Sequence, residues 1–488
     1  MFWISINRLW TDHIKEMEGN GLITFSDRQI RVPKLARPVY MISGGMSQFA
    51  RAFPRKKTEE LVIEAFLMMA EILGMSPLEL KSYIQAGFYG HFADHFGDQL
   101  LGEALIHDRL GLDPLPGMGV KTGGATGGYN MWAAMMAVAS GVVDCALAIG
   151  WERMDEVPTD EGNNYIACAA DRDWETYLGH IYAGYYSPMA TRYWEMIAQK
   201  DPKFRETLAK IAVKHRGYAL HNPFAHGGKM ITEEDVLNSP LVANPLRALD
   251  CCLMSVGSAG VIFCDEATAN EIHKKAPHIV PLRVFIGVGT HTLRAGDRRP
   301  MEIPLLPHET LEMYNNYPHR YPGFTSFLAT RIACRDAYRM AGIKDPLVDF
   351  DLAELHDAFT ISDLQSYEDC GFRPYGRGRE FVESGDCYLI NPHTNLPGRL
   401  PTNLSGGLIG CMHAVGATGE MQVVELALHL WGIHGQIHGD SKRWEAFGKE
   451  KPEDWLDLSV PDAKCGLGIS HAGVGSHVAA TILRKEAA

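Results

Sequence analysis

Residues 120–150, VKTGGATGGYNMWAAMMAVASGVVDCALAIG, decide the fold class. A glycine-rich turn opens onto the apolar run that starts at Met131, which predicts a buried helix, and Ser140-Gly141 predicts a tight turn. The following VVDCALAIG is typical of a buried strand, and Asp144 interrupts what would otherwise resemble a membrane span. The stretch therefore predicts a turn, a helix and a strand of an α/β protein.

The same alternation of strands and helices recurs on both sides of this stretch. Upstream, residues 39–50 predict a buried strand, and residues 57–74 predict an amphipathic helix with Thr58 as its N-cap and Gly74 as its stop. Downstream, strands are expected at 259–264, 282–289 and 347–359, and helices at 324–342 and 360–372. Alternating elements with buried strands predict a parallel sheet covered by helices.

Two features suggest how this α/β chain is organised. Between residues 152 and 245 an acidic loop-like segment and several helical patterns predict an inserted, mostly helical lobe. The tetrapeptide Gly-Ala-Thr-Gly occurs at 124–127 and again at 416–419, each time just before an apolar helix. Together with the alternation in both parts of the chain, this echo favours a duplicated α/β architecture.

The gross composition excludes several classes of protein. A net charge of −13 over 488 residues argues against a nucleic-acid partner. Ten cysteines without a Cys-x-x-Cys pair indicate reduced thiols in a cytoplasmic protein. The N-terminal residues lack a basic segment followed by an apolar core, so we expect no signal peptide, and we expect no membrane association.

Three histidines stand where an open α/β sheet places its ligands. His356 lies where a predicted strand gives way to a helix, and His413 and His471 lie in glycine-rich turns. Neighbouring glycines would let backbone amides approach a substrate oxygen, while an imidazole supplies a donor or a base. Each histidine could instead be a satisfied core group, as we expect for most of the 21 histidines, including His221, His226 and His477.

Cofactor motifs are not apparent from the spacing of residues. No set of His, Cys and acidic residues has the spacing of zinc ligands, so the sequence predicts no metal. Neither Gly-Ala-Thr-Gly turn is followed by the Lys-Ser/Thr of a phosphate loop, and we expect no nucleotide redox cofactor.

Six segments, taken together and in order, resemble the thiolase superfamily, in particular its archaeal-type and sterol-carrier-protein-type branch. The resemblance runs from about residue 38 to residue 486. The segments are RPVYMISGGMSQFAR, AVASGVVDCALAIGWERM, DVLNSPLVANPLRALDC, ELHDAFTISDLQSYEDCGF, NLSGGLIGCMHAVGATG and SHAGVGSH.

The resemblance implies a thiolase fold. That fold has two similar βαβαβαββ halves in a five-layer α-β-α-β-α arrangement with an inserted loop domain. The expected units are an N-terminal extension (1–37), the first half (38–151 and 246–280), the loop domain (152–245) and the second half (281–488).

The resemblance also implies roles for particular residues. His356 would belong to the motif that lines the acyl pocket, and His413 would polarise the thioester carbonyl. His471 would replace the cysteine base of better-known thiolases, and Asn403 would help to hold this region. The backbone amides of Gly124 and Gly473 would form an oxyanion hole.

The chain departs from the family at the position of the nucleophile. The family carries its acyl group on a cysteine in a Val-Glu-Ala-Ala-Cys-Ala-Ser-Gly segment, and Gly124 occupies that position here. Cys411, two residues before His413, is a conceivable displaced nucleophile, although cysteines in packed turns are usually inert.

Three functions remain open at the level of sequence. The first is an enzyme that makes or breaks the C–C bond next to a coenzyme A thioester without an acyl-cysteine, by aldol or Claisen chemistry through a stabilised enolate. The second is a genuine 3-ketoacyl-CoA thiolase or acyltransferase with an unusual nucleophile. The third is a non-catalytic thiolase-like subunit of a complex.

The resemblance further implies an acyl-CoA substrate and a homodimer or dimer of dimers. Members of this branch often pair with a small zinc-ribbon/OB-fold subunit, so such a partner is expected as an option. The aromatic-rich segment 177–194 could line an acyl pocket, although packing between helices is the simpler interpretation.

Overall fold

The computed structural model describes residues 34–179, 181–291, 303–314 and 323–486. The expected N-terminal extension lies mostly outside these residues. Nine strands of the described part form one sheet in the order β3-β2-β4-β7-β1-β8-β11-β10-β9. Their bounds are β1 Tyr40–Met46, β2 Ala86–Gly90, β3 Gly117–Val120, β4 Cys145–Arg153, β7 Val256–Cys264, β8 Leu282–Thr290, β9 Leu352–Glu354, β10 Cys465–Ala472 and β11 His477–Lys485.

The strand order repeats once along the chain. The first half runs β1-β7-β4-β2-β3 and the second half runs β8-β11-β10-β9, with Thr402 bridged in parallel to Ala353 on the outer side of β9. The halves meet where β1 and β8 pair, through Tyr40 with Arg283 and Met41 with Leu282. The chain therefore contains the duplicated architecture that the repeated tetrapeptide indicates.

The expected all-parallel sheet is wrong, because the sheet is mixed. Strands β2, β3 and β4 are parallel, as are β9 and β10, but β7 runs antiparallel to both β4 and β1. Strands β10 and β11 form a hairpin across the short turn 473–476. A parallel pair needs a crossover of a dozen or more residues, so this short connection forces the antiparallel arrangement.

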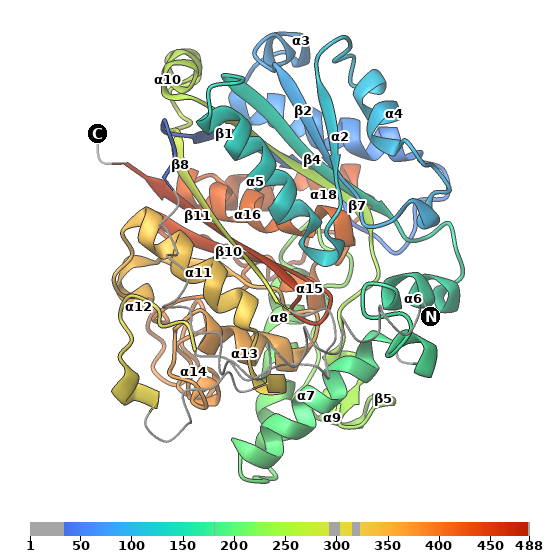
Figure 1. The fold of residues 1–488 in the computed structure, drawn as a ribbon, viewed down its shortest axis with the longest axis vertical. Helices are drawn as coiled ribbons and strands as arrows, with labels where there is room; N and C mark the ends of the chain where they lie inside the picture. Colours follow the sequence, from blue (N-terminus) through green and yellow to red (C-terminus); the bar gives the residue numbers. More distant parts are fainter. Residues whose placement is uncertain (1–33, 180, 292–302, 315–322, 487–488) are drawn as a thin grey trace, which may run out of the picture.

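Helices form three layers around the strands (Figure 1). Helices α5 (Thr126–Ala139) and α16 (Thr418–Trp431) pack on each other and on strands of both halves. Helix α2 (Thr58–Leu73) covers the strands of the first half, and α11 (Leu328–Ala341) covers β8 and β11 of the second. With the strands between them, these helices give the expected α-β-α-β-α order.

The two Gly-Ala-Thr-Gly turns occupy equivalent positions and pack against each other. Each forms a single 3₁₀ turn at the start of its central helix, at Gly123–Ala125 and Val415–Ala417. A Cβ at Gly419 would lie 2.5 Å from the amide nitrogen of Gly128, closer than real Cβ contacts. Glycine is therefore required where the central helices of the two halves cross.

The remaining helices cover the edges and build the inserted lobe. Their bounds are α3 Pro77–Lys81, α4 Gly102–Arg109, α6 Thr159–Ala167, α7 Tyr182–Met196, α8 Phe204–Leu220, α9 Glu233–Asn238, α10 Glu266–Lys275, α12 Pro346–Asp349, α13 Thr360–Asp369, α14 Gly378–Glu383, α15 Gly407–Gly410, α17 His434–Gly439 and α18 Ser441–Ala446. Four of these, α6 to α9, lie within 152–245 and are followed by the small pair β5 Leu241–Ala243 and β6 Leu246–Arg247, as a mostly helical lobe requires. The exact domain boundaries stay a prediction.

Two local expectations are wrong. The expected strand over 347–359 contains the short helix α12, because the Asp345 side chain accepts from the Leu347 amide (2.9 Å) and Pro346 supplies a favourable first helical residue. Helix α2 is capped at Lys57, one residue before Thr58, and ends at Gly74 as expected.

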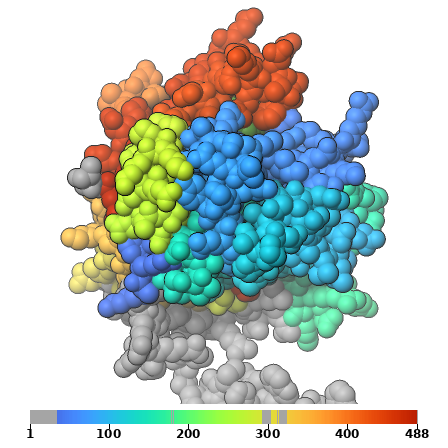
Figure 2. Space-filling view, turned by 90° about the horizontal axis from the view of Figure 1, so that it is seen from above, coloured from blue at the N-terminus to red at the C-terminus, as the bar shows by residue number. Residues whose placement is uncertain are grey.

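Helices α3 and α10 lie side by side on the upper face of the molecule, where Figure 2 shows α10 in yellow-green beside blue residues of the first half. Lys275 forms an ion pair with Glu79 (3.0 Å), and Tyr83 donates a hydrogen bond to Glu271 (2.8 Å).

Within the part of the chain that the structure describes, no helix combines the length and apolarity needed to cross a bilayer.

Four buried glutamates make the fold sensitive to alkali. Burial raises the pKa of Glu152, Glu354, Glu368 and Glu420 to about 8. Since each folded-state pKa lies above its usual value of about 4.5, the stabilisation is complete below pH 4.5 and is lost progressively as pH rises from there through 8. We therefore expect the free energy of unfolding to decrease by about 1 kcal/mol per glutamate between pH 7 and pH 9, and the melting temperature to fall with it.

Glu420→Gln tests this expectation by scanning calorimetry, because glutamine mimics the protonated carboxyl. The variant should lose less stability than the parent between pH 7 and pH 9. Glu234→Gln, at an exposed position of α9, serves as the matched control and should leave the profile unchanged. Identical profiles for Glu420→Gln and the parent protein would contradict the assignment.

Candidate active site

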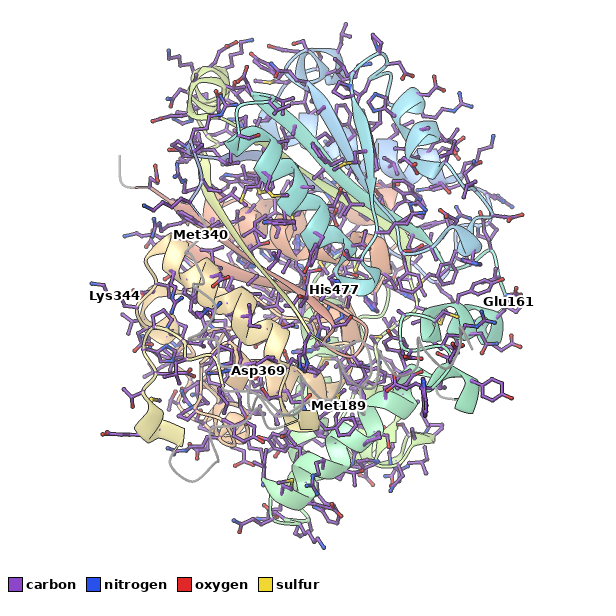
Figure 3. All side chains as sticks on the ribbon, in the orientation of Figure 1. Glu161, Met189, Met340, Lys344, Asp369 and His477 are labelled. Atoms are coloured by element: carbon purple, nitrogen blue, oxygen red, sulfur yellow. The ribbon has the colours of Figure 1, made fainter. Side chains whose placement is uncertain are left out.

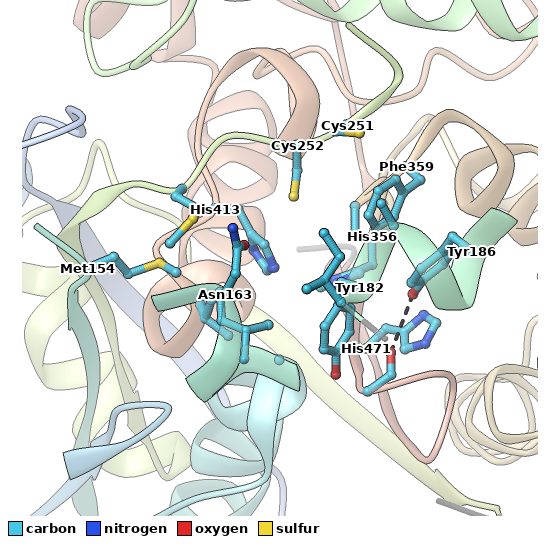
Figure 4. Close-up of a pocket in the computed structure, with 18 of the residues that line it drawn as sticks. Met154, Asn163, Tyr182, Tyr186, Cys251, Cys252, His356, Phe359, His413 and His471 are labelled. Carbon is cyan, nitrogen blue, oxygen red and sulfur yellow. Dashed lines mark hydrogen bonds between the residues drawn. The ribbon is translucent and has the colours of Figure 1, made fainter. Parts of the chain in front are cut away.

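Residues from all three expected units surround one cavity of about 300 Å³ (Figure 4). The three histidines and the two oxyanion-hole glycines singled out by the sequence all line it: His356, His413, His471, Gly124 and Gly473. These residues are separated by up to 349 positions in the chain, yet the two similar halves bring them to one place. The remaining lining is largely apolar, which strengthens electrostatic interactions inside the cavity.

His356 lies two residues after the last residue of β9 and is 3% exposed. Its ring centre lies 5.2 Å from that of His413 and 5.1 Å from that of His471. Burial, with the two neighbouring imidazoles, lowers the pKa of His356 well below its usual 6.5. Its Nδ1 atom is buried and has no hydrogen-bond partner among the described residues.

His413 lies between α15 and the second Gly-Ala-Thr-Gly turn. Its Nδ1 atom lies 2.9 Å from the Thr418 hydroxyl, which donates to the Ala414 carbonyl (3.2 Å). Since the hydroxyl proton is used there, Nδ1 of His413 carries the ring proton and Nε2 has a free lone pair. Burial lowers the pKa of His413 to about 4, so the imidazole is neutral at pH 7. A neutral ring with a free Nε2 can accept a proton.

His471 lies on β10 and packs edge-on to Phe327, with ring centres 4.5 Å apart. Its backbone carbonyl points at the turn that contains Gly124. The three imidazoles thus come from the end of β9, from the turn before α16 and from β10, all in the second half.

Gly124 has no room for a side chain. A Cβ built at this residue would lie 2.5 Å from the carbonyl oxygen of His471 and 3.5 Å from the Cα of Ala472. Real Cβ atoms essentially never approach backbone that closely. The strand β10 therefore occupies the space that a nucleophilic side chain at position 124 would need.

Gly473 lines the same cavity as Gly124 and stands at the start of the hairpin turn between β10 and β11. Its φ of +58° is a left-handed conformation that favours glycine. The hydroxyl of Tyr186 donates to its carbonyl at 3.4 Å, drawn as a dashed line in Figure 4. Both glycines bring backbone to the cavity, as an oxyanion hole requires.

A buried polar network holds the loop that carries His413 against the loop that carries His356. Asn403 exchanges two hydrogen bonds with the backbone of Leu355, at 2.8 and 3.1 Å. Asp357 accepts from the amides of Leu408 (2.7 Å) and Ile409 (3.2 Å) at the start of α15. Asn403 thus fits the supporting role that the sequence suggests.

Cysteines near the cavity differ from the expectation. Cys411 is fully buried in the core and does not line the cavity, and burial raises its pKa well above 9, which argues against a nucleophilic role. Cys252, which the sequence analysis did not single out, does line the cavity, and Figure 4 shows its sulfur directed between His413 and His356. Burial raises its pKa as well.

The inserted lobe supplies cavity residues that sequence reasoning left undecided. Tyr182 and Tyr186 of α7 line the cavity, whereas Tyr185 and Tyr193 of the same helix are buried in the hydrophobic core. Tyr186 also belongs to that core, so both interpretations of the aromatic-rich segment hold and this side chain combines them. The three background histidines lie outside the cavity lining: His221, His226 and His477, the last on β11 (Figure 3).

Comparisons with known proteins show the family of the chain. Residues 313–443 match the family model described as thiolase C-terminal domain-like. The chain is 33% identical to the acetyl-CoA acetyltransferase of Methanothermobacter thermautotrophicus over 78% of this chain and 88% of that one. It is 29% identical to sterol carrier protein 2 of Bos taurus over 70% of this chain and 58% of that one.

A solved structure of the Ltp2-ChsH2(DUF35) aldolase superposes with a TM-score of 0.67 at 20% identity, over 93% of this chain and 99% of that one. The two-half α/β fold and its histidine-lined cavity thus define an enzyme of the acyl-CoA class. The chain belongs to the thiolase superfamily, in the branch that contains the archaeal acetyl-CoA acetyltransferases and sterol carrier protein 2.

Proposed function

We propose that this enzyme cleaves or forms the C–C bond next to a coenzyme A thioester without an acyl-cysteine intermediate. The observation that carries the proposal is the position of the His471 carbonyl, 2.5 Å from where a Cβ at Gly124 would lie. A thiolase needs a thiolate at this place to hold the acyl group. Here the place is filled by backbone, while the three imidazoles and the two glycine backbones remain.

The retro-aldol reaction of a 3-hydroxyacyl-CoA fits these groups. In this proposal His413 acts as a base and does not polarise the thioester carbonyl, the role that the resemblance implies. Nε2 of neutral His413 takes the proton of the 3-hydroxyl, the bond between C2 and C3 breaks, and C3 leaves as an aldehyde or ketone. The electron pair passes to the thioester carbonyl, and the amides of Gly124 and Gly473 stabilise the enolate oxygen. Return of the proton to C2 then gives the shortened acyl-CoA.

A second candidate is thiolysis with a nucleophile at another position. Cys252 is the residue that favours it, since its side chain faces His413 across the cavity. Burial keeps this thiol protonated, however, and a thiol attacks far more slowly than a thiolate. The retro-aldol reaction is therefore the better supported of the two.

We also propose that the enzyme works as an oligomer. Strand β3 is an edge of the sheet, its residues are largely exposed, and Met118 on it is 47% exposed. An unpaired exposed edge suits pairing with a second copy. The Ltp2-ChsH2(DUF35) aldolase, whose structure is similar to that of this chain, combines Ltp2 with ChsH2(DUF35). That combination supports a small second subunit as a further partner of this enzyme. Light scattering of the protein, alone and coexpressed with such a subunit, tests both associations.

The decisive experiment is incubation of the purified protein with 3-oxoacyl- and 3-hydroxyacyl-CoAs, with and without free coenzyme A, followed by mass spectrometry. Release of an aldehyde or ketone without added coenzyme A is expected from the 3-hydroxyacyl substrates. Strict dependence on coenzyme A, with two acyl-CoA products and an acyl group on Cys252, would replace the proposal with thiolysis. No turnover in any condition would point to a non-catalytic subunit.

A further inference from the structure

A second cluster of titratable side chains lies between the middle of α16 and α17, outside the cavity. It consists of Glu425 on α16 and His434 and His438 on α17. All three side chains are buried, with at most 1% exposed, and their ligand-type atoms lie within 4.8 Å of one another. From these residues we propose a binding site for a divalent transition-metal ion of the zinc class, held by two imidazoles and one carboxylate.

The inward-facing atoms of the cluster lack hydrogen-bond partners. Within residues 34–486, as far as they are described, Glu425 Oε2, His434 Nε2 and His438 Nε2 are buried and accept or donate no hydrogen bond. Leaving three such atoms without partners costs several kcal/mol together. An ion between them would satisfy all three.

The spacing of these atoms fits metal ligands better than an ion pair. Glu425 Oε2 lies 3.3 Å from His438 Nε2 and 3.8 Å from His434 Nε2. Two ligands at the usual zinc distances on a tetrahedral ion lie about 3.4 Å apart. A charge-assisted hydrogen bond would bring nitrogen and oxygen to about 2.8 Å.

Neighbouring groups decide which atoms of His434 and Glu425 are left for an ion. The Ser459 hydroxyl donates to Asp457 (2.6 Å), so the proton between it and His434 Nδ1 (3.5 Å) belongs to the imidazole. His434 Nε2 therefore carries the lone pair. The Asn222 amide donates to Glu425 Oε1 (3.1 Å), which leaves Oε2 for the ion. Such second partners of ligand residues are typical of metal sites.

His429 lies beside this cluster and serves as a comparison for the two proposed histidine ligands. Its ring stacks on that of His434 with centres 3.9 Å apart, and it is equally buried. The amide of Val460 donates to its Nδ1 (3.2 Å), so the ring proton stays on Nε2 and no lone pair faces the cluster. His429 is therefore a neighbour of the site and not a ligand.

The role of such an ion is structural. The ligands join the middle of α16 to α17, and Asn222 links Glu425 onward to the carbonyl of Ser405 (3.0 Å) in the loop near the active site. A buried ion with three protein ligands would fix α17 on the central helix, and binding free energy would add to folding stability.

Cobalt and zinc titrations of the chelator-treated full-length protein test the site. We expect one equivalent of Co²⁺ to bind with a visible d–d absorption band that one equivalent of Zn²⁺ abolishes. Zinc should also raise the melting temperature. His434→Ala and His438→Ala should weaken Co²⁺ binding at least about 100-fold, whereas His429→Ala should keep the band.

Two results would overturn the site independently of variant folding. One is parent protein that binds neither ion at one equivalent and shows no thermal shift. The other is Co²⁺ binding that persists unchanged in folded His434→Ala and His438→Ala, as judged by circular dichroism.

Discussion

The His413→Ala variant is expected to lose about 10²- to 10⁴-fold in kcat/KM on a cleavable acyl-CoA, the range for removal of a general base. In the folded protein Thr418 holds the ring proton on Nδ1, so Nε2 is the atom that can accept the substrate proton. Alanine removes that acceptor and supplies no other side-chain atom beside Thr418 that could accept the proton.

The pH profile separates catalysis from mere packing at His413. The lowered pKa of about 4 keeps the imidazole neutral, so parent activity should persist at pH 5.5, where an ordinary histidine is largely protonated. It should decline as pH falls through the pKa of His413. His477→Ala, a histidine outside the cavity lining, should retain parent activity. Equal loss in both variants, or an unchanged rate for His413→Ala, would contradict the role of His413 as the base.

Gly124→Ala is expected to abolish most activity, by at least about 10²-fold in kcat, the scale for loss of one oxyanion donor. The added methyl would press on the His471 carbonyl, and either β10 or the turn would have to shift. A shift of that size moves the amide of Gly124 away from the enolate oxygen. Steady-state kinetics with the cleavable acyl-CoA measures the effect.

Gly124→Cys carries the same argument further. We expect no acyl-enzyme by intact mass spectrometry and no gain of thiolysis, because the thiol cannot take its place without moving β10. Gly217→Ala is the matched control, since a Cβ on this residue of α8 meets nothing within 4 Å. A Gly124→Cys protein that accumulates an acyl-enzyme would overturn the account of the filled position.

The sequence predicts the architecture because its signals are local or repeated. The buried strand at 39–50, the helix from residue 58 to Gly74 and the two Gly-Ala-Thr-Gly turns all appear where the patterns indicate. Strand direction was not predictable in the same way. Whether β7 runs parallel or antiparallel to β4 depends on where the inserted lobe returns the chain, and no periodicity records that.

The site residues likewise divide into those that the sequence predicts and those that it does not. The junction of a strand and a helix identifies His356, glycine-rich turns identify His413 and His471, and all three line one cavity. Cys252 has no such motif, and its place in the cavity depends on contact between the first half and the loop at 358, where its amide bonds to Ala358. The metal cluster has a partial signal, the His-x-x-x-His spacing of 434 and 438, but its carboxylate lies on a different helix.

The crossing of the two central helices also limits whether one half of the chain could replace the other. Glu420 holds the position in α16 that Gly128 holds in α5, and its carboxylate lies over Gly127 and Gly150 of the first half. A Cβ at Gly128 would already meet Ser470 and Ala479 at under 3 Å. A chimera of two second halves would therefore collide, and one of two first halves would leave a void. The halves share one plan but are no longer interchangeable modules, and recombination between them should be selected against.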